Sequence, residues 1–502
     1  MKKTVLIILT LLVIIAGALL ILKKPAALFA RESNKAANTY SIQFLNKPPH
    51  DIPTDITADQ LTLARFAWNE FLALNWKSSY VFSGTRRERG EPDLFWNYTN
   101  NRQPYPDLAV WETYNHRVEF RPGDDKMLSF DKIPTYVYKS GTPKADPGID
   151  LHLFNNLDEN NEIGSCNLYA YTNKYGEQHQ VLYQAKVNRD EYDYIRRTYP
   201  TAEQLKQANK TTYNNIQQYN RYYKGSTNTC DCPSAEGVVC LPCGTIPKTP
   251  ADRNQEGSIE VKTAWRKMLP EDGTADTYFK RKILTYRKDP GGAVRAINDT
   301  YLLIGLHIIH KTTRFPNFIY ATWEHKDVTS SQVSMGYVKL DSTGKEYGGI
   351  ITGYPRTHGI THEVEVANNE AHYLLNGANP SSVWKNYFLI GVQSQTTSDS
   401  NVPNFFLANY VIESDSVLQL FNGSSIDDPF NRKDNIVYNG VRYSMGGCQG
   451  CHGVAQFRLG SDLSFLCDTV NKPVDMPDVG QVSNKRIRYQ NAFRLFDKVT
   501  NQ

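Results

Sequence analysis

The sequence carries almost no excess charge outside its N-terminal end, and this excludes some partners. The chain has 502 residues, with 56 Lys and Arg against 52 Asp and Glu. Lys2, Lys3, Lys23 and Lys24 account for the whole difference, and no long basic run with interleaved aromatic residues is present. The sequence therefore argues against a nucleic-acid partner. It also lacks an internal repeat, which argues against solenoid and propeller folds.

Cysteine and histidine are scarce, with 8 and 11 residues in the chain, so their close grouping near the C-terminus is informative. Cys448, Cys451 and His452 form C-x-x-C-H, the attachment motif of a c-type haem. The two thiols form thioethers with the porphyrin vinyl groups, and the histidine binds the iron as its proximal ligand. A random chain of this composition would contain only about 0.003 such motifs. We therefore predict one covalent haem c at these residues.

Two other kinds of site also use closely spaced cysteines: a zinc site and a redox disulfide. A zinc site would need a second pair of ligands at a suitable distance from this motif. A redox disulfide of the thioredoxin type usually opens a helix beside a βαβ pattern, which the surrounding sequence does not show. Haem attachment is favoured over both.

The N-terminus predicts a membrane anchor. Residues 4–22 are nineteen residues without a charge, and at 1.5 Å per residue a helix over them spans about 28 Å, close to a bilayer core. A cleaved signal peptide has a shorter apolar region and a small-x-small site, whereas residues 28–30 offer only a weak site. An uncleaved single-pass anchor over residues 1–24 is favoured. Because c-type haem is attached outside the bacterial cytoplasmic membrane, we expect the bulk of the chain in the periplasm.

The remaining chain divides into three parts. Residues 25–56 are polar and proline-spotted, as in a periplasmic tether. Residues 57–435 predict a large α+β body with a mixed or antiparallel sheet, including buried strands over 301–309, 318–323 and 387–392. Its first helix follows Thr57, the expected cap. Residues 436–502 form the C-terminal haem-attachment segment, and because only fifty residues follow His452, we expect this segment to dock on the body.

The second axial ligand of the iron stays open. A methionine or a histidine is expected for a six-coordinate iron, and the candidates, in order of preference, are His307, Met476 and His325. His307 and His310 are separated by an odd number, so on a strand they point to opposite faces and at most one of them faces the haem.

The other cysteines suggest disulfides. Near a Cys-rich insertion at about 225–250, four of them form C-x-C-x7-C-x2-C, namely Cys230, Cys232, Cys240 and Cys243. The seven-residue gap is short for a zinc site, and an oxidising periplasm favours disulfides. We expect two disulfides of undetermined pairing, with a metal knuckle as the alternative. Cys166 and Cys467 remain, and a bond between them would tie the haem segment to the body.

Several stretches together resemble a family of large, mostly uncharacterised single-haem "cytochrome c family" proteins of Gram-negative bacteria. They span most of the chain from 60 to 470 and comprise residues 66–76, 110–114, 305–308, 321–325, 389–393, 407–410 and 448–455. Only the haem motif among them carries defined chemistry. The resemblance raises His307 and His325 slightly as haem-pocket residues.

Three functions follow as hypotheses. The first is a membrane-anchored periplasmic c-type cytochrome that passes single electrons between a redox donor and an acceptor protein, neither of which the sequence identifies. The second is a haem-dependent, peroxidase-like oxidoreductase with an open iron site under the large body. The third is a non-enzymatic binding or assembly protein whose haem is structural or sensory. A six-coordinate low-spin iron would oppose the second.

Overall fold

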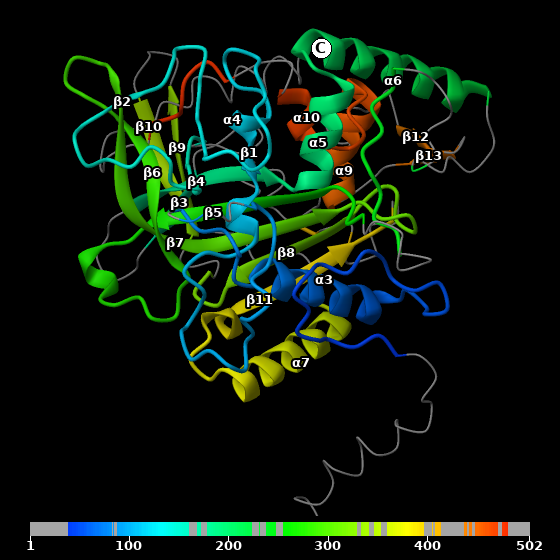
Figure 1. Ribbon diagram of the computed structural model, residues 1–502, viewed down its shortest axis with the longest axis horizontal. Coiled ribbons are helices and arrows are strands. Elements are labelled where there is room, and N and C mark those ends of the chain that lie inside the picture. The colour runs from blue at the N-terminus through cyan, green and yellow to red at the C-terminus, as the bar shows by residue number, and fades with distance from the viewer. Residues whose placement is uncertain are drawn as a thin grey trace, which may run out of the picture.

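A computed structural model gives the architecture (Figure 1). It describes residues 39–82, 84, 88–159, 168–171, 178–222, 230, 237–246, 255–328, 333–340, 346–352, 359–395, 404, 407–412, 436–438, 441–443, 447–469 and 474–479.

The fold is α+β, built on a large sheet of eleven strands whose order is β10-β9-β3-β4-β5-β7-β8-β11, with β1 paired to β4 and with β2 and β6 paired to β7. All pairs are antiparallel except β2 with β7. The strands are β1 (Asn115–His116), β2 (Lys144–Ala145), β3 (Leu168–Tyr171), β4 (Gln178–Val187), β5 (Ile259–Lys267), β6 (Lys280–Lys288), β7 (Val294–His310), β8 (Ile319–His325), β9 (Val333–Leu340), β10 (Glu346–Thr352) and β11 (Tyr387–Gln393). A separate two-stranded sheet joins β12 (Ile436–Tyr438) to β13 (Val441–Tyr443).

Helices cover both faces of the large sheet (Figure 1). They are α3 (Gln60–Leu74), α4 (Arg117–Phe120), α5 (Arg189–Thr198), α6 (Ala202–Tyr222), α7 (His362–Ala378), α9 (Gly447–Val454) and α10 (Phe465–Thr469), with a π-helical turn over Ala455–Leu459 and 3-10 turns over Trp111–Thr113, Pro270–Asp272 and Val383–Asn386. In Figure 1, α3 and α7 lie on one side of the sheet, and α9 and α10 lie on the other side beside α5. We call these the α3 face and the α9 face.

The central strands are buried on both faces. Every residue of β8 is buried, as are the last ten of β7. A strand covered on both sides has a nearly continuous apolar run instead of an alternating pattern, which is why the sequence predicted these strands. On the α3 face, Trp323 stacks on Phe71 of α3 with ring centroids 5.0 Å apart.

The cap of α3 lies two residues beyond the predicted one. Asp59, not Thr57, is the N-cap, and its carboxylate accepts a 2.8 Å hydrogen bond from the backbone N–H of Thr62. An aspartate is at least as good a cap as a threonine, and the helix therefore begins at Gln60.

The predicted tether over residues 25–56 is wrong for its second half, because residues 39–56 pack against the body. Ile52 is fully buried, and the guanidinium of Arg314 donates a 2.8 Å hydrogen bond to the carbonyl of Pro53. The prolines that suggested a tether belong to a packed, irregular segment.

The predicted membrane anchor, residues 1–24, lies outside the described residues. Within the part of the chain that the structure describes, no helix is both long and apolar enough to cross a membrane.

Two of the clustered cysteines are joined. Cys230 and Cys243 form a disulfide, a pairing that the sequence left open. Cys240 is also disulfide-bonded, and Cys232 lies outside the described residues. Cys467 is a buried free thiol, and Cys166, the other cysteine that the sequence left for it, lies outside the described residues.

Candidate functional site

The C-x-x-C-H motif begins at the first turn of α9, which docks on the α9 face of the sheet. Gly447 opens the helix with φ of +66°, and a Cβ there would lie 2.3 Å from the carbonyl oxygen of Asn404, so this position requires glycine. The backbone N–H of Gln449 donates a 2.8 Å hydrogen bond to the side-chain oxygen of Gln393, at the end of β11. The C-terminal segment is therefore held by the upstream body.

His452 presents one ring nitrogen for a ligand bond. Its Nδ1 lies 2.8 Å from the carbonyl oxygen of Leu463. Because a carbonyl only accepts, Nδ1 carries the proton and Nε2 carries the lone pair. Nε2 has no hydrogen-bond partner among the residues that the structure describes. The ring lies between Tyr320 and Phe465, with centroids at 4.9 Å and 5.1 Å.

The imidazole of His452 is neutral at physiological pH. Burial, together with the charge of Lys262, lowers its pKa to about 4. A neutral imidazole with a fixed Nδ1–H is the form in which histidine binds a metal through Nε2, and a carbonyl acceptor behind the ring is the usual way of fixing it.

A strained turn places the Leu463 carbonyl. Asp462 and Leu463 both have positive φ, 54° and 65°, a region that non-glycine residues rarely adopt. The Asp462 carboxylate holds the turn, because it accepts a 2.6 Å hydrogen bond from the backbone N–H of Leu241 and pairs with the ammonium of Lys311. Lys311 is fully buried. The body thus fixes the turn that orients His452.

The two cysteines of the motif lie in the same helix. Cys448 is half-buried in the first turn of α9. Cys451 follows three positions later in the same helix.

His307 lies on the face of the sheet that carries α9. In the sheet register it is opposite Lys262 of β5 and Thr322 of β8. Burial, with the nearby charges of Lys262 and His452, lowers its pKa to about 3. His307 is therefore a buried, neutral imidazole on the same face of the sheet as His452.

His310 points to the opposite face, as the odd separation from His307 predicts. Its Nδ1 pairs with the carboxylate of Glu70 of α3, and its Nε2 donates a 2.6 Å hydrogen bond to the carbonyl of Glu256. This histidine belongs to the α3 face.

The other two candidates for the distal position lie away from α9. His325, at the far end of β8, donates from Nε2 to the carbonyl of Thr277 at 3.0 Å and accepts at Nδ1 from the N–H of Asp327 at 3.2 Å, so both nitrogens are used. Met476 is 50% exposed. The carbonyl of Val474, two residues before it, accepts a 3.1 Å hydrogen bond from the backbone N–H of Lys139.

Sequence reasoning missed the groups that hold the site together. The Leu463 carbonyl leaves no side-chain signal, and the partner of Asp462 is 151 residues away in the chain. Tyr320 is the exception, because it lies in the buried strand that the sequence predicts over residues 318–323.

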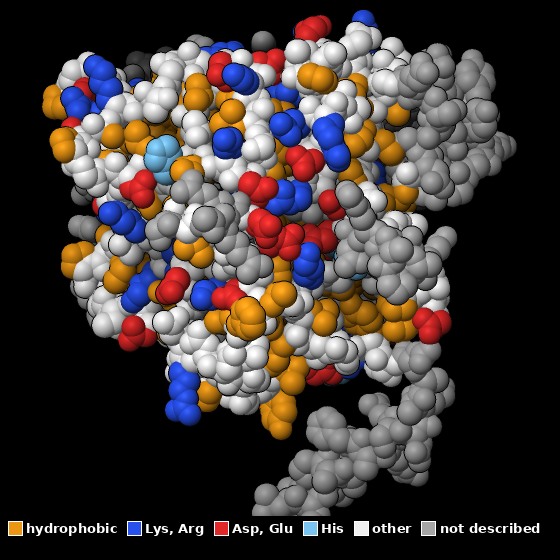
Figure 2. All heavy atoms as spheres, in the orientation of Figure 1, with side chains coloured by type: hydrophobic (Ala, Val, Ile, Leu, Met, Phe, Trp, Pro, Cys, Tyr) orange, Lys and Arg blue, Asp and Glu red, His pale blue; other side chains and the backbone are white. Residues whose placement is uncertain are grey.

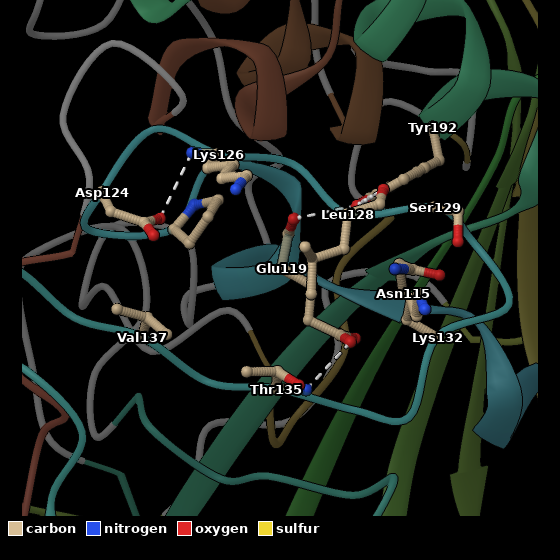
Figure 3. A pocket seen from close by; sticks show the side chains of 11 residues that line it. Asn115, Glu119, Asp124, Lys126, Leu128, Ser129, Lys132, Thr135, Val137 and Tyr192 are labelled. Atoms are coloured by element: carbon tan, nitrogen blue, oxygen red, sulfur yellow. Dashed lines mark hydrogen bonds between the residues drawn. The ribbon is translucent and has the colours of Figure 1, made fainter.

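A separate surface pocket of about 110 Å³ lies beside β1 and α4 (Figure 3). Glu119 points into it, but its two carboxylate oxygens pair with Arg89 at 2.9 and 2.8 Å and one of them also accepts from Thr135. None of the predicted site residues lines this pocket. We assign no chemistry to it.

The surface gives no sign of a strongly charged partner on the face in Figure 2. Acidic and basic side chains are interspersed there, in agreement with the balanced composition. Among the described residues, no group of three or more His, Cys, Asp or Glu is placed to hold a metal ion directly.

Comparisons with known proteins identify no relative. No protein-family model, no curated protein and no solved structure matches this chain.

Proposed function

We propose that this protein is a membrane-anchored periplasmic c-type cytochrome that carries one covalent haem and transfers single electrons. The observation that carries the proposal is the hydrogen bond from Nδ1 of His452 to the Leu463 carbonyl. Within C-x-x-C-H, this bond leaves Nε2 as the free donor atom, as a proximal iron ligand requires. A redox disulfide would not require a histidine held in this tautomer.

The residues of the site fit the roles that a haem requires. Cys448 and Cys451 would form the thioethers, and His452 would bind the iron. His307 is the distal candidate that the fold brings to the same face of the sheet. When bound, the haem would supply the one-electron couple of its iron, and two histidine ligands would give a lower reduction potential than histidine with methionine.

The N-terminal run of nineteen uncharged residues supports the anchor, and covalent haem supports the periplasm. The body would hold the haem segment by Gln393 and Lys311, and Tyr320 of the body would pack with Phe465 of α10 against the His452 ring. Donor and acceptor are expected to be one-electron redox proteins.

The test is whether haem stays with the denatured polypeptide. The chain is expressed in a host with c-haem maturation, denatured, and separated by electrophoresis with haem staining. We expect retained haem in the wild type, and loss of it in the double variant Cys448→Ala/Cys451→Ala. The control Cys467→Ala, which removes a buried thiol outside the motif, should retain it. Haem that leaves the wild-type chain on denaturation would refute the proposal.

A further inference from the structure

Two neighbouring apolar side chains project into solvent from a loop beside α3. Phe95 is 87% exposed, more than any other large apolar side chain that the structure describes, and Leu94 is 65% exposed. Single exposed apolar side chains are ordinary on a protein surface, but two adjacent ones with this exposure keep an unfavourable apolar surface in water. We call this pair the Leu94–Phe95 tip, and its chemistry suits an apolar partner.

The loop that carries the tip is held in one shape by its own polar groups. The N–H of Phe95 donates a 3.0 Å hydrogen bond to the carboxylate of Asp93, and the amide of Asn100 donates one of 3.0 Å to the carbonyl of Phe95. The side chain of Asn97 accepts from the N–H groups of Thr99 and Asn100 at 2.9 and 2.8 Å. A preorganised loop presents its side chains with a small loss of entropy on binding.

Aromatic side chains fix the base of this loop on the end of α3. The ring of Trp96 packs on that of Trp76, just after α3, with centroids 5.0 Å apart, and Tyr98 packs on the same ring at 5.6 Å. The hydroxyl of Tyr98 donates a 2.8 Å hydrogen bond to the carbonyl of Leu72 in α3. The tip therefore belongs to the α3 face, on the other side of the sheet from α9 (Figure 1).

The N-terminal segment of the described chain lies against the same loop. Phe44 stacks on Tyr98 with ring centroids 4.8 Å apart. The described chain begins at residue 39, so residues 25–38, fourteen in all, separate it from the predicted anchor. Fourteen residues reach at most about 50 Å when fully extended. The anchor would therefore keep this side of the body close to the bilayer.

The charges around the tip do not oppose a lipid surface. From Glu91 to Arg102 the chain has two carboxylates and one guanidinium. Glu91 pairs with Lys47 at 3.0 Å, and Asp93 pairs with Lys77 at 3.2 Å. Arg102 is exposed and adds a positive charge. Because phospholipid headgroups carry a negative phosphate, this balance favours their approach.

The small area of the tip favours lipid over a protein partner. Even at about 250 Å² for each side chain, the upper value for an aromatic residue, the pair offers only about 500 Å². A stable protein interface buries roughly 800 Å² per partner. A contact with lipid needs less, because the anchor would already hold the body at the membrane and make the second contact intramolecular.

We propose that Leu94 and Phe95 insert into the interfacial layer of the phospholipid bilayer that holds the anchor, and so fix the orientation of the body on the membrane. The inference rests on the proposed function, because it needs the anchor. The α3 face would then lie toward the bilayer. The α9 face, with Cys448, Cys451 and His452, would lie toward the periplasm and be open to a soluble redox partner.

The test is photo-crosslinking of the full-length chain in the membranes of a host with c-haem maturation. A benzophenone amino acid takes the place of Phe95, the membranes are illuminated, and the mass of the purified chain is measured. We expect adducts of phospholipid mass. Because Phe95 is exposed, the replacement leaves the packed core untouched.

Leu128 is the matched control position. It is also an exposed apolar residue, but its carbonyl accepts a 2.9 Å hydrogen bond from the hydroxyl of Tyr192 in α5, the helix beside α9. The same benzophenone amino acid in place of Leu128 should give no lipid adduct.

A second pair of variants tests the apolar character of the contact. With the benzophenone at position 95, Leu94→Glu places a carboxylate in the tip, and the lipid adducts should be lost because a charge resists transfer into an apolar layer. Leu94→Ile keeps an apolar side chain and should retain the adducts.

The outcomes separate this proposal from the function on which it rests. Adducts of protein mass at position 95 would assign the tip to a protein partner and overturn the insertion. Equal lipid adducts at positions 95 and 128, or none at 95, would also overturn it and leave the anchored cytochrome intact. A chain that leaves the membranes in an alkaline carbonate wash would overturn the anchor, and a chain without covalent haem would overturn the cytochrome.

Discussion

The buried pair of Lys311 and Asp462 is expected to be a large single contribution to the stability of the haem segment. The lysine side chain is 0% and the aspartate side chain 3% exposed, so either one, left alone, is an unpaired charge in a dry region. Removing one partner of such a pair costs about 3–5 kcal/mol, whereas replacing both is often close to neutral. We therefore expect Lys311→Met to lower the free energy of unfolding by about 3–5 kcal/mol.

Asp462→Asn is the second single substitution of a double-mutant cycle on this pair. Asparagine tolerates the positive φ of this residue and can still accept from the N–H of Leu241, so the substitution removes the charge and little else. It should cost a similar amount, and Lys311→Met/Asp462→Asn should cost about 3 kcal/mol less than the sum of the two.

The assay is urea unfolding of all four proteins at one pH, with the midpoint and slope fitted for each. The same samples are scored for haem retention after denaturation, because the turn that Asp462 holds also orients His452. Additive costs, or single substitutions that cost less than about 1 kcal/mol, would refute the argument that this pair anchors the turn.

Three further predictions concern neighbouring parts of the structure. Burial opposes the charge of His310, but the charge and hydrogen bond of Glu70, the Glu256 carbonyl and the charge of Asp51 together raise its pKa. Its stabilising contribution is therefore complete below about pH 6.5 and is lost as pH rises through the folded pKa. Glu70→Gln should flatten that decline in urea unfolding measured from pH 5 to 9, and an unchanged pH profile would contradict it. Gly447→Ala should destabilise the docking of α9 by at least about 1–3 kcal/mol and lower the yield of covalent haem, and an unchanged yield would show that the close contact there is relaxed easily. His307→Ala should convert a low-spin iron to a high-spin or water-bound one in the optical spectrum, and an unchanged low-spin spectrum would exclude this histidine as the distal ligand.

Much of the sheet could be predicted because burial on both faces leaves a mark in the sequence. The stretches 301–309, 318–323 and 387–392 are nearly continuous apolar runs, and the structure has β7, β8 and β11 there. The opposite orientation of His307 and His310 follows from the two-residue period of a strand. Both results depend on local rules.

The tether and the site could not be predicted in the same way. A polar segment with prolines has the same kind of sequence whether it is a free linker or packs on the body. Only a contact distant in the chain, such as the hydrogen bond from Arg314 to the carbonyl of Pro53, distinguishes the two cases. The site depends on pairs that are distant in the chain. Lys311 and Asp462 are 151 residues apart, and nothing in either local sequence points to the other.

The long-range contacts give a physical reason for so large a body around a single proposed haem. The described polar contacts that position α9 and the following turn involve Gln393, the N–H of Leu241 and Lys311, all from the upstream chain. The candidate distal ligand His307 also comes from one of its central strands, β7. In the proposed cytochrome the motif would supply the attachment chemistry, whereas the upstream body holds the turn whose Leu463 carbonyl fixes the tautomer of His452, and it supplies the sixth-ligand candidate. Because each of these quantities shifts a reduction potential, the body is where the potential of the proposed cytochrome would be tuned.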